Sequence, residues 1–263
     1  MIKLNELTVK HKSGKILLEN ISFSLDKGEA LGLTGASGAG KTTILKTILG
    51  LLGSGVGVTL GSVIIDDKDI TKLREKEKRL MRGKTLGFIP QSPMTAFDDR
   101  LTIGKQMIET LKVHGITENA KELALNSLKD VGLLDAQRVF DSCSLQLSGG
   151  MLQRVCVALL LILDPEYIIA DEPTAALDNE NKMLLLSLLK QRLTKSAILI
   201  VTHDPDVLKS FCENVIVLEN GKIIEHTNEL FENPKTQWSK QFVQASKLGE
   251  DQEFTWTESL QRI

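Results

Sequence analysis

Apolar residues recur along this chain with two different periods. Near the N-terminus they alternate with polar residues, which predicts strands over 4–9 and 21–25. Further strands are expected at 61–65, 85–89, 167–171, 197–201 and 214–218, and helices after residue 42 and at 149–162, 179–193 and 205–212. Between 101 and 136 the apolar residues instead recur every three or four positions, which indicates a block of helices. Strands and helices that alternate around an inserted helical block predict an α/β fold.

A glycine-rich segment directly follows the apolar run 30–34. Residues 35–42 have the G-x-x-x-x-G-K-[ST] spacing of a P-loop, whose glycines let successive backbone N–H groups converge on phosphate oxygens. Lys41 can reach the β- and γ-phosphates, and the Thr42 hydroxyl can coordinate Mg²⁺. The nucleotide-binding residues expected here are Gly35, Ala36, Ser37, Gly38, Ala39, Gly40, Lys41, Thr42 and Thr43. A glycine-rich turn that only joins a strand to a helix is the alternative, but Lys41-Thr42 at this offset favour a nucleoside triphosphate site.

Two acidic residues, Asp171 and Glu172, end a second apolar strand. In a P-loop protein, Asp171 at this place would hold Mg²⁺ and Glu172 would polarise the attacking water. Either carboxylate could instead cap a helix that starts near Pro173, so the pair by itself is weak evidence.

A second possible anion-binding helix start lies at 147–154, which reads Leu-Ser-Gly-Gly-Met-Leu-Gln-Arg. Ser148 and the backbone amides of Gly149 and Gly150 could bind an anion. A plain helix N-cap would explain the segment equally well if it stood alone.

This segment resembles the LSGGQ signature of ABC ATPases, and other motifs of that family occur in the expected order. Gln91 matches the Q-loop glutamine, Asp178 ends a match to the D-loop, and His203 matches the switch histidine. Taken singly, Gln91 could be a surface residue, Asp178 a helix cap and His203 a buried neutral imidazole. The ordered set favours the family, and the resemblance extends over roughly residues 1–235.

The resemblance implies a fold and a site. The fold would be an α/β P-loop NTPase with a RecA-like core, an antiparallel β-subdomain and an α-helical subdomain inserted at about 92–160; residues 1–235 would form the ATPase domain and 236–263 a C-terminal helical or polar extension. ATP and Mg²⁺ would be the cofactors, and the signature of one subunit would close over the P-loop of another. The assigned residues are Glu172, His203 and Gln91 for catalysis, Thr42, Gln91 and Asp171 for Mg²⁺, and Ser148, Gly149, Gly150 and Asp178 for the nucleotide. His11 would take the place of an adenine-stacking aromatic residue, with a solvated loop histidine as a nearly equal alternative.

Several details resemble the ATPases of the dipeptide, oligopeptide and nickel importers. The segment 91–97, Met151 in the signature and the tail 221–234 are similar to that group. Two departures favour nickel or metal-chelate import. Asp98-Asp99 follow Phe97 where the group often has Asn-Pro, and no cysteine follows Cys212, whereas peptide-importing members often end in a cysteine cluster. An oligopeptide or dipeptide importer is the main alternative; an exporter ATPase and a soluble ABC protein are further ones.

An importer ATPase of this kind would lie peripherally on the cytoplasmic face of the cell membrane. The expected partners are a second, similar ATPase in a heterodimer, two membrane permeases and a substrate-binding protein, with a homodimer left open. Met94 and Phe97, which follow Gln91 closely, would form part of the surface that receives a permease helix.

Composition narrows these expectations. With 32 basic and 34 acidic residues the net charge is −2. This balance gives no indication of the positively charged surface that binds nucleic acid. The three cysteines are spaced too irregularly for a disulfide framework or a zinc motif and suit a reducing compartment. The longest apolar run, Val155–Leu163, is too short to span a bilayer, and the N-terminus has no apolar signal-peptide region.

Overall fold

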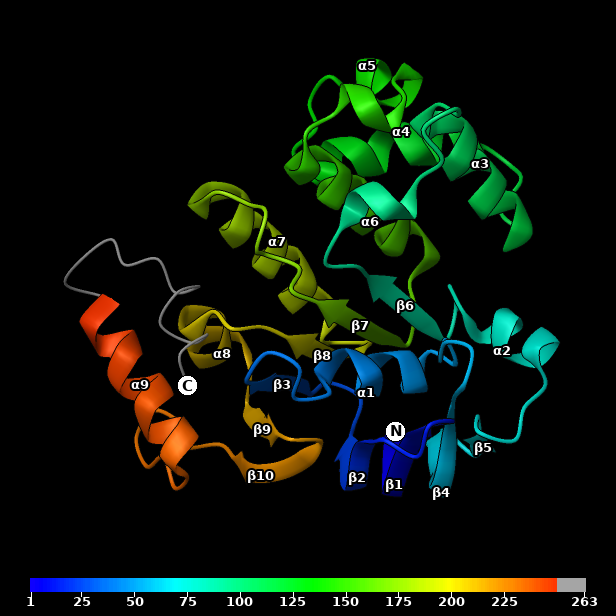
Figure 1. Ribbon diagram of the computed structural model, residues 1–263. Helices are drawn as coiled ribbons and strands as arrows, with labels where there is room; N and C mark the ends of the chain where they lie inside the picture. The colour runs from blue at the N-terminus through cyan, green and yellow to red at the C-terminus, as the bar shows by residue number, and fades with distance from the viewer. Residues whose placement is uncertain (250–263) are drawn as a thin grey trace. The chain divides into compact units, whose positions relative to one another are not determined.

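The computed structural model describes residues 1–249 and divides the chain into two compact units (Figure 1). The first unit consists of Met1–Lys78 together with the chain from Ile198 onward, and the second of Arg79–Ala197. Each unit buries apolar side chains of its own, such as Leu31 in the first and Ile168 in the second.

The N-terminal part of the first unit is an antiparallel sheet with the strand order β2-β1-β4-β5. Its strands are β1 (Ile2–His11), β2 (Ile16–Leu25), β4 (Val56–Ile65) and the short β5 (Lys68–Asp69). Leu4 of β1 pairs with Phe23 on one side and Val63 on the other, and all three side chains are buried. The predicted strands 4–9, 21–25 and 61–65 are therefore confirmed, although β4 starts earlier than predicted, at Val56.

The second sheet region of this unit has β3 (Ala30–Gly35) between β8 (Ala197–Val201) and β9 (Asn214–Glu219). Both neighbours run parallel to β3, and β10 (Lys222–Thr227) pairs antiparallel with β9. Every residue of β3 is buried, as expected of a central strand in a parallel sheet. The chain leaves β3 through the glycine-rich loop and enters α1 (Lys41–Ile48).

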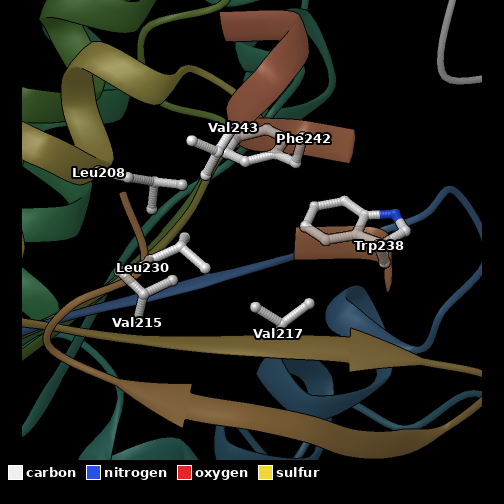
Figure 2. Packing of buried hydrophobic residues seen from close by; sticks show 7 residues of the cluster. All are labelled: Leu208, Val215, Val217, Leu230, Trp238, Phe242 and Val243. Atoms are coloured by element: carbon white, nitrogen blue, oxygen red, sulfur yellow. The ribbon is translucent and has the colours of Figure 1, made fainter. Parts of the chain in front are cut away.

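A C-terminal helix, α9 (Gln237–Gly249), packs onto β9 in the same unit (Figure 2). Trp238 and Phe242 stack with ring centroids 5.0 Å apart and planes inclined by 13°. The buried cluster that they join consists of Leu208 of α8 (Pro205–Phe211), Val215, Val217, Leu230, Trp238, Phe242 and Val243. Ala36 of the glycine-rich loop packs against this cluster, so the cluster also supports that loop.

Glu225 of β10 holds the start of α9 in place. Its carboxylate accepts hydrogen bonds from the backbone N–H groups of Lys235 and Thr236 and from the Ser239 hydroxyl, the last at 2.7 Å. Burial opposes ionisation of this group, but the hydrogen bonds from Ser239, Thr236 and Lys235 outweigh burial and lower the pKa of the carboxyl.

We expect Glu225→Gln to lower the free energy of unfolding by roughly 1.5–3 kcal/mol at neutral pH, the usual contribution of hydrogen bonds to a charged group. Because the folded-state pKa of Glu225 is lowered, its stabilisation is present above the ordinary carboxyl pKa and is lost as the pH falls through the lower folded value. Urea unfolding of both proteins at several pH values would test this, with Glu229→Gln as a control in the same segment. If Glu225→Gln lowered the free energy of unfolding equally above and below the carboxyl pKa, the charge of Glu225 would not be the cause of the stabilisation.

The second unit combines two parallel strands with a group of helices. The strands are β6 (Leu86–Ile89) and β7 (Tyr167–Asp171), which pair in register from Leu86↔Tyr167 to Ile89↔Ala170. The helices are α3 (Ile103–Val113), α4 (Ala120–Asp130), α5 (Ala136–Asp141), α6 (Gly149–Leu163) and α7 (Asn179–Arg192), with 3₁₀ turns at Pro93–Ala96 and Ser144–Gln146; α2 (Glu75–Met81) spans the boundary between the units. Gly104 brings α3 close to α5, since a Cβ there would lie 2.2 Å from the Phe140 ring.

The predicted fold class is confirmed: strands and helices alternate around an antiparallel β-region and a block of helices. The predicted helical block 101–136 corresponds to α3, α4 and the start of α5. The domain limits at about 92–160 and at 235 stay predictions, and the last fourteen residues of the expected C-terminal extension, 250–263, lie outside the described part. Within residues 1–249, no helix combines the length and apolarity that crossing a membrane requires.

Candidate functional site

The glycine-rich loop turns sharply between β3 and α1. Gly35 has a φ of 139° and pairs with Leu218 of β9, whose carbonyl oxygen would lie only 2.0 Å from a Cβ at position 35. Gly40 is the N-cap of α1, with a φ of 108°, and contributes no side-chain cap. Backbone N–H groups at an uncapped helix start are suited to bind an anion, so the loop geometry fits the predicted phosphate site.

Lys41 is buried and folds back onto this loop. Its Nζ donates hydrogen bonds to the carbonyl oxygens of Gly35 at 2.6 Å and Ala36 at 2.9 Å. The other predicted residues of the loop range from exposed (Ser37, Gly38, Thr42) through half-buried (Ala36, Gly40, Thr43) to buried (Gly35, Ala39). The carbonyl oxygens of the loop therefore hold the ammonium group at the loop.

His203 follows β8 in the same unit as Lys41. Burial, together with the positive charge of Lys41, lowers the pKa of the imidazole to about 4. The ring is therefore neutral at physiological pH, which agrees with the alternative interpretation of His203 as a buried neutral imidazole. A neutral imidazole can donate or accept a hydrogen bond at a phosphate oxygen, so this state is compatible with the switch role as well.

We expect His203 to titrate near pH 4 in the nucleotide-free protein and Lys41→Met to raise that pKa, because the substitution removes a neighbouring positive charge. The pKa of His203 is about 4 in the folded protein and has its ordinary value of 6.5 in the unfolded chain. Between these values the folded protein binds fewer protons than the unfolded chain, so the free energy of unfolding should increase as the pH rises from about 4 to 6.5. NMR titration of the imidazole would measure the shift. Lys46→Met, on the exposed face of α1, is the control, and an unchanged pKa in Lys41→Met would contradict the electrostatic cause.

His11 ends β1 and is half-buried. Its Nδ1 accepts a hydrogen bond from the Ser13 backbone N–H at 3.2 Å and lies 2.8 Å from the Ser13 hydroxyl oxygen. A Cβ at Gly55 would lie 3.4 Å from Nε2, so the ring rests close to that glycine. These contacts fix the ring orientation, and adenine stacking by His11 stays a prediction.

Asp171 ends β7 in the second unit, and Glu172 follows it directly. Every residue of β7 is buried, and Asp171 is 6% exposed. Glu172 follows with a φ of 47°, in the left-handed region that residues other than Gly, Asn and Asp seldom adopt. Such strain is concentrated at functional sites, so the backbone supports a chemical role for this carboxylate.

Ser148 caps the long helix α6. Its Oγ accepts a hydrogen bond from the Met151 N–H at 3.2 Å, so the N-cap alternative describes a real contact. The hydroxyl keeps a hydrogen to donate, and capping is therefore compatible with anion binding. Gly150 lies against the predicted D-loop, since a Cβ there would be 3.4 Å from the Ala176 carbonyl oxygen.

Gln91 and Asp178 both lie on the surface of the second unit. Gln91 follows Pro90 after β6 and is exposed. Asp178 is the N-cap of α7, and hydrogen bonds from Asn181 lower the pKa of its carboxyl. Its capping role is thus observed, while its part in the nucleotide site stays a prediction.

The predicted site residues are divided between the two units. The P-loop, His203 and His11 belong to the first unit, and Gln91, the signature, Asp171, Glu172 and Asp178 to the second. Sequence reasoning missed Gln153, a buried amide in α6 that reaches the Pro90 carbonyl oxygen. The available signal was a polar pair, Gln153-Arg154, at the end of the signature-like segment 147–154 and just before an apolar helical run.

Comparison with known proteins identifies the family of this chain. The ABC transporter family profile matches residues 18–175. The chain belongs to the ABC transporter family. It is 37% identical to the metal-staphylopine import system ATP-binding protein CntD of Staphylococcus aureus. The alignment extends over 254 residues and covers 92% of this chain and 93% of CntD. It is also 37% identical over 226 residues to the dipeptide transport ATP-binding protein DppD of Lactococcus lactis subsp. cremoris, covering 83% of this chain and 64% of that one.

Solved structures support the same family. The dimeric post-hydrolysis structure of the ATP-binding cassette MJ0796 bound to ADP and phosphate matches with a TM-score of 0.76 and 29% identity, over 90% of this chain and 100% of that one. This ABC chain is therefore an ATPase with ATP as its nucleotide, and its class as a P-loop NTPase is confirmed.

Proposed function

We propose that this ABC ATPase powers the import of nickel or another metal, free or as a chelate, across the cell membrane. The observation that carries the proposal is the similarity to CntD, which extends over 92% of this chain and 93% of that metal-staphylopine importer subunit. Peptide import is the second candidate, supported by an equal identity to DppD over a shorter alignment.

On the P-loop side, the triphosphate would lie against the N–H groups of the glycine-rich loop and the start of α1. Lys41 would exchange its hydrogen bonds to the Gly35 and Ala36 carbonyl oxygens for bonds to the phosphates. His203, neutral at physiological pH, would hydrogen-bond to the γ-phosphate without adding charge.

On the second unit, Glu172 would act as general base for the attacking water. The oxygen-bearing side chains of Gln91 and Asp171 here, and of Thr42 in the first unit, each suit a hard cation such as Mg²⁺, which prefers oxygen ligands. When bound, that ion would neutralise phosphate charge, while Gln91 and Asp171 would orient around it.

The complete site would need two ATPase chains. Ser148, Gly149, Gly150 and Asp178 of one subunit would close over the nucleotide held by the P-loop of the other. We propose a heterodimer with a second, similar ATPase, because the importer group that this chain resembles uses paired ATPases. A homodimer is the competing arrangement, since the chain carries every motif that two equal sites need.

The remaining partners would be two permeases, with the ATPases bound peripherally at the cytoplasmic face, and a substrate-binding protein outside the membrane. Met94 and Phe97 are the proposed contacts for a permease helix. Met94 is 41% exposed and Phe97 half-buried, which suits a small apolar docking point.

The test is uptake in a strain that lacks this gene, supplied with labelled nickel, cobalt, zinc, metal chelates or peptides. Loss of metal uptake, restored by the wild-type chain and not by Glu172→Gln, is the expected result. Loss of peptide uptake instead would establish the second candidate. Unchanged uptake of all these substrates would refute the importer proposal.

A further inference from the structure

A pocket of about 330 Å³ lies in the first unit beside the start of α9. This volume is within the range of small-molecule binding sites. The walls come from β9, β10 and the first turns of α9, and the lining residues are Glu219, Ile224, Thr236, Gln237, Trp238 and Gln241. Among these residues one side chain is acidic, three are neutral and polar, and none is basic, so the lining has one formal negative charge.

The Glu219 carboxylate is half-buried, and the neighbouring lysine does not neutralise it. Lys222 lies opposite Glu219 in the ladder between β9 and β10, but its Nζ lies 3.1 Å from a carboxylate oxygen of Glu19 instead. Within the described part of the chain, the Glu219 carboxylate forms neither an ion pair nor a hydrogen bond. A carboxylate of this kind in the wall of a pocket is available to a positively charged ligand.

The start of α9 could instead attract an anion, because a helix N-terminus carries partial positive charge. That charge is already offset by the Glu225 carboxylate, which accepts hydrogen bonds from the backbone N–H groups of Lys235 and Thr236. The Thr236 hydroxyl accepts a further one from the Ser239 N–H at 3.2 Å. Because Glu219 would also repel an anion, the electrostatics of the pocket favour a cation.

We propose that this pocket binds a small organic cation, with Glu219 as its counter-charge. A guanidinium group fits the lining, because its planar set of N–H donors can pair with a carboxylate and with the amide oxygens of Gln237 and Gln241. The Trp238 indole adds an aromatic surface of the kind to which such cations are attracted.

The pocket is connected to the nucleotide-binding loop inside the same unit. Trp238 belongs to the buried cluster of Figure 2, and Ile224 packs against it. Ala36 of the glycine-rich loop packs against the same cluster. A ligand that holds Trp238 and Ile224 in place therefore also stabilises the support of the loop. Since such linkage is reciprocal, the cation should raise ATP affinity by the same factor by which ATP raises the affinity for the cation.

The probes for this site are L-arginine and its uncharged isostere L-citrulline, measured by calorimetry on the full chain without nucleotide. We expect saturable binding of arginine and at least ~10-fold weaker binding of citrulline, the usual scale for losing hydrogen bonds to a charged group. Saturating arginine should raise ATP affinity about fivefold, at the lower end of typical coupling between sites.

Glu219→Gln is the matching change in the protein. It should weaken arginine binding at least ~10-fold and leave the Tm without ligand unchanged, because the carboxylate has no partner to lose among the described residues. Glu232→Gln, an exposed position in the segment before α9, is the control and should bind arginine as the wild type does.

The comparison of arginine with citrulline needs no variant, so it decides the question even if Glu219→Gln folds poorly. Absence of saturable arginine binding, equal affinities for the two probes, or binding that survives Glu219→Gln would refute the cation site. Binding of inorganic phosphate that Glu219→Gln strengthens would show an anion site in its place. If arginine binds through Glu219 but leaves ATP affinity unchanged, the link to the nucleotide-binding loop is wrong.

Discussion

Replacing Glu172 with glutamine should leave ATP binding nearly intact and slow ATP hydrolysis by at least ~10²-fold, the usual effect of losing a general base. The substitution keeps the size of the side chain and removes its charge. It leaves the left-handed backbone at φ 47° equally strained, so stability should change little. Turnover and nucleotide affinity, measured on the same preparation, separate the chemical step from binding.

Glu180→Gln is a suitable control for this experiment. Glu180 lies in the first turn of α7, is exposed, and belongs to the same unit as Glu172. Its substitution should leave turnover unchanged. If Glu172→Gln kept turnover within a few-fold of wild type, Glu172 would not be the catalytic carboxylate.

Gly35→Ala is expected to destabilise the protein by at least ~3 kcal/mol and to abolish ATP binding, the scale of a severe backbone clash. The added Cβ would lie 2.0 Å from the Leu218 carbonyl oxygen, far inside van der Waals contact. Relief would require β3 and β9 to separate where the phosphate-binding loop begins. Thermal unfolding and nucleotide binding would both report the loss.

Gly38→Ala in the same loop is the matched comparison. Gly38 also has a positive φ, of 77°, but no heavy atom lies within 4 Å of a Cβ built there. The substitution should lower the free energy of unfolding by only about 1 kcal/mol, because alanine is disfavoured in a left-handed backbone conformation. Equal effects of the two substitutions would show that conformational preference, rather than the contact with Leu218, decides the requirement for glycine at position 35.

The secondary structure and the glycine-rich loop between β3 and α1 were predictable because both depend on residues close in sequence. Period-two patterns predicted strands 4–9 and 21–25, and the predicted strand 167–171 and helix 149–162 agree with the structure to within one residue. The P-loop needs glycines, Lys41 and a helix start within one short segment. The C-terminal helix was less predictable, because its start depends on Glu225 and the Trp238–Phe242 cluster as well as on local residues.

By itself, the sequence determined the order of the motifs, the α/β class and the nucleotide chemistry, because these follow from local spacing and residue type. Only the tertiary structure decided how individual residues are held. Burial and the positive charge of Lys41, which is distant in the sequence, lower the pKa of His203, and the Leu218 carbonyl oxygen lies where a Cβ at position 35 would be. Gln153 of α6 donates a hydrogen bond to the carbonyl oxygen of Pro90, the residue before Gln91. Charge, close contact and burial act through space, so these effects appear only when the fold brings distant segments together.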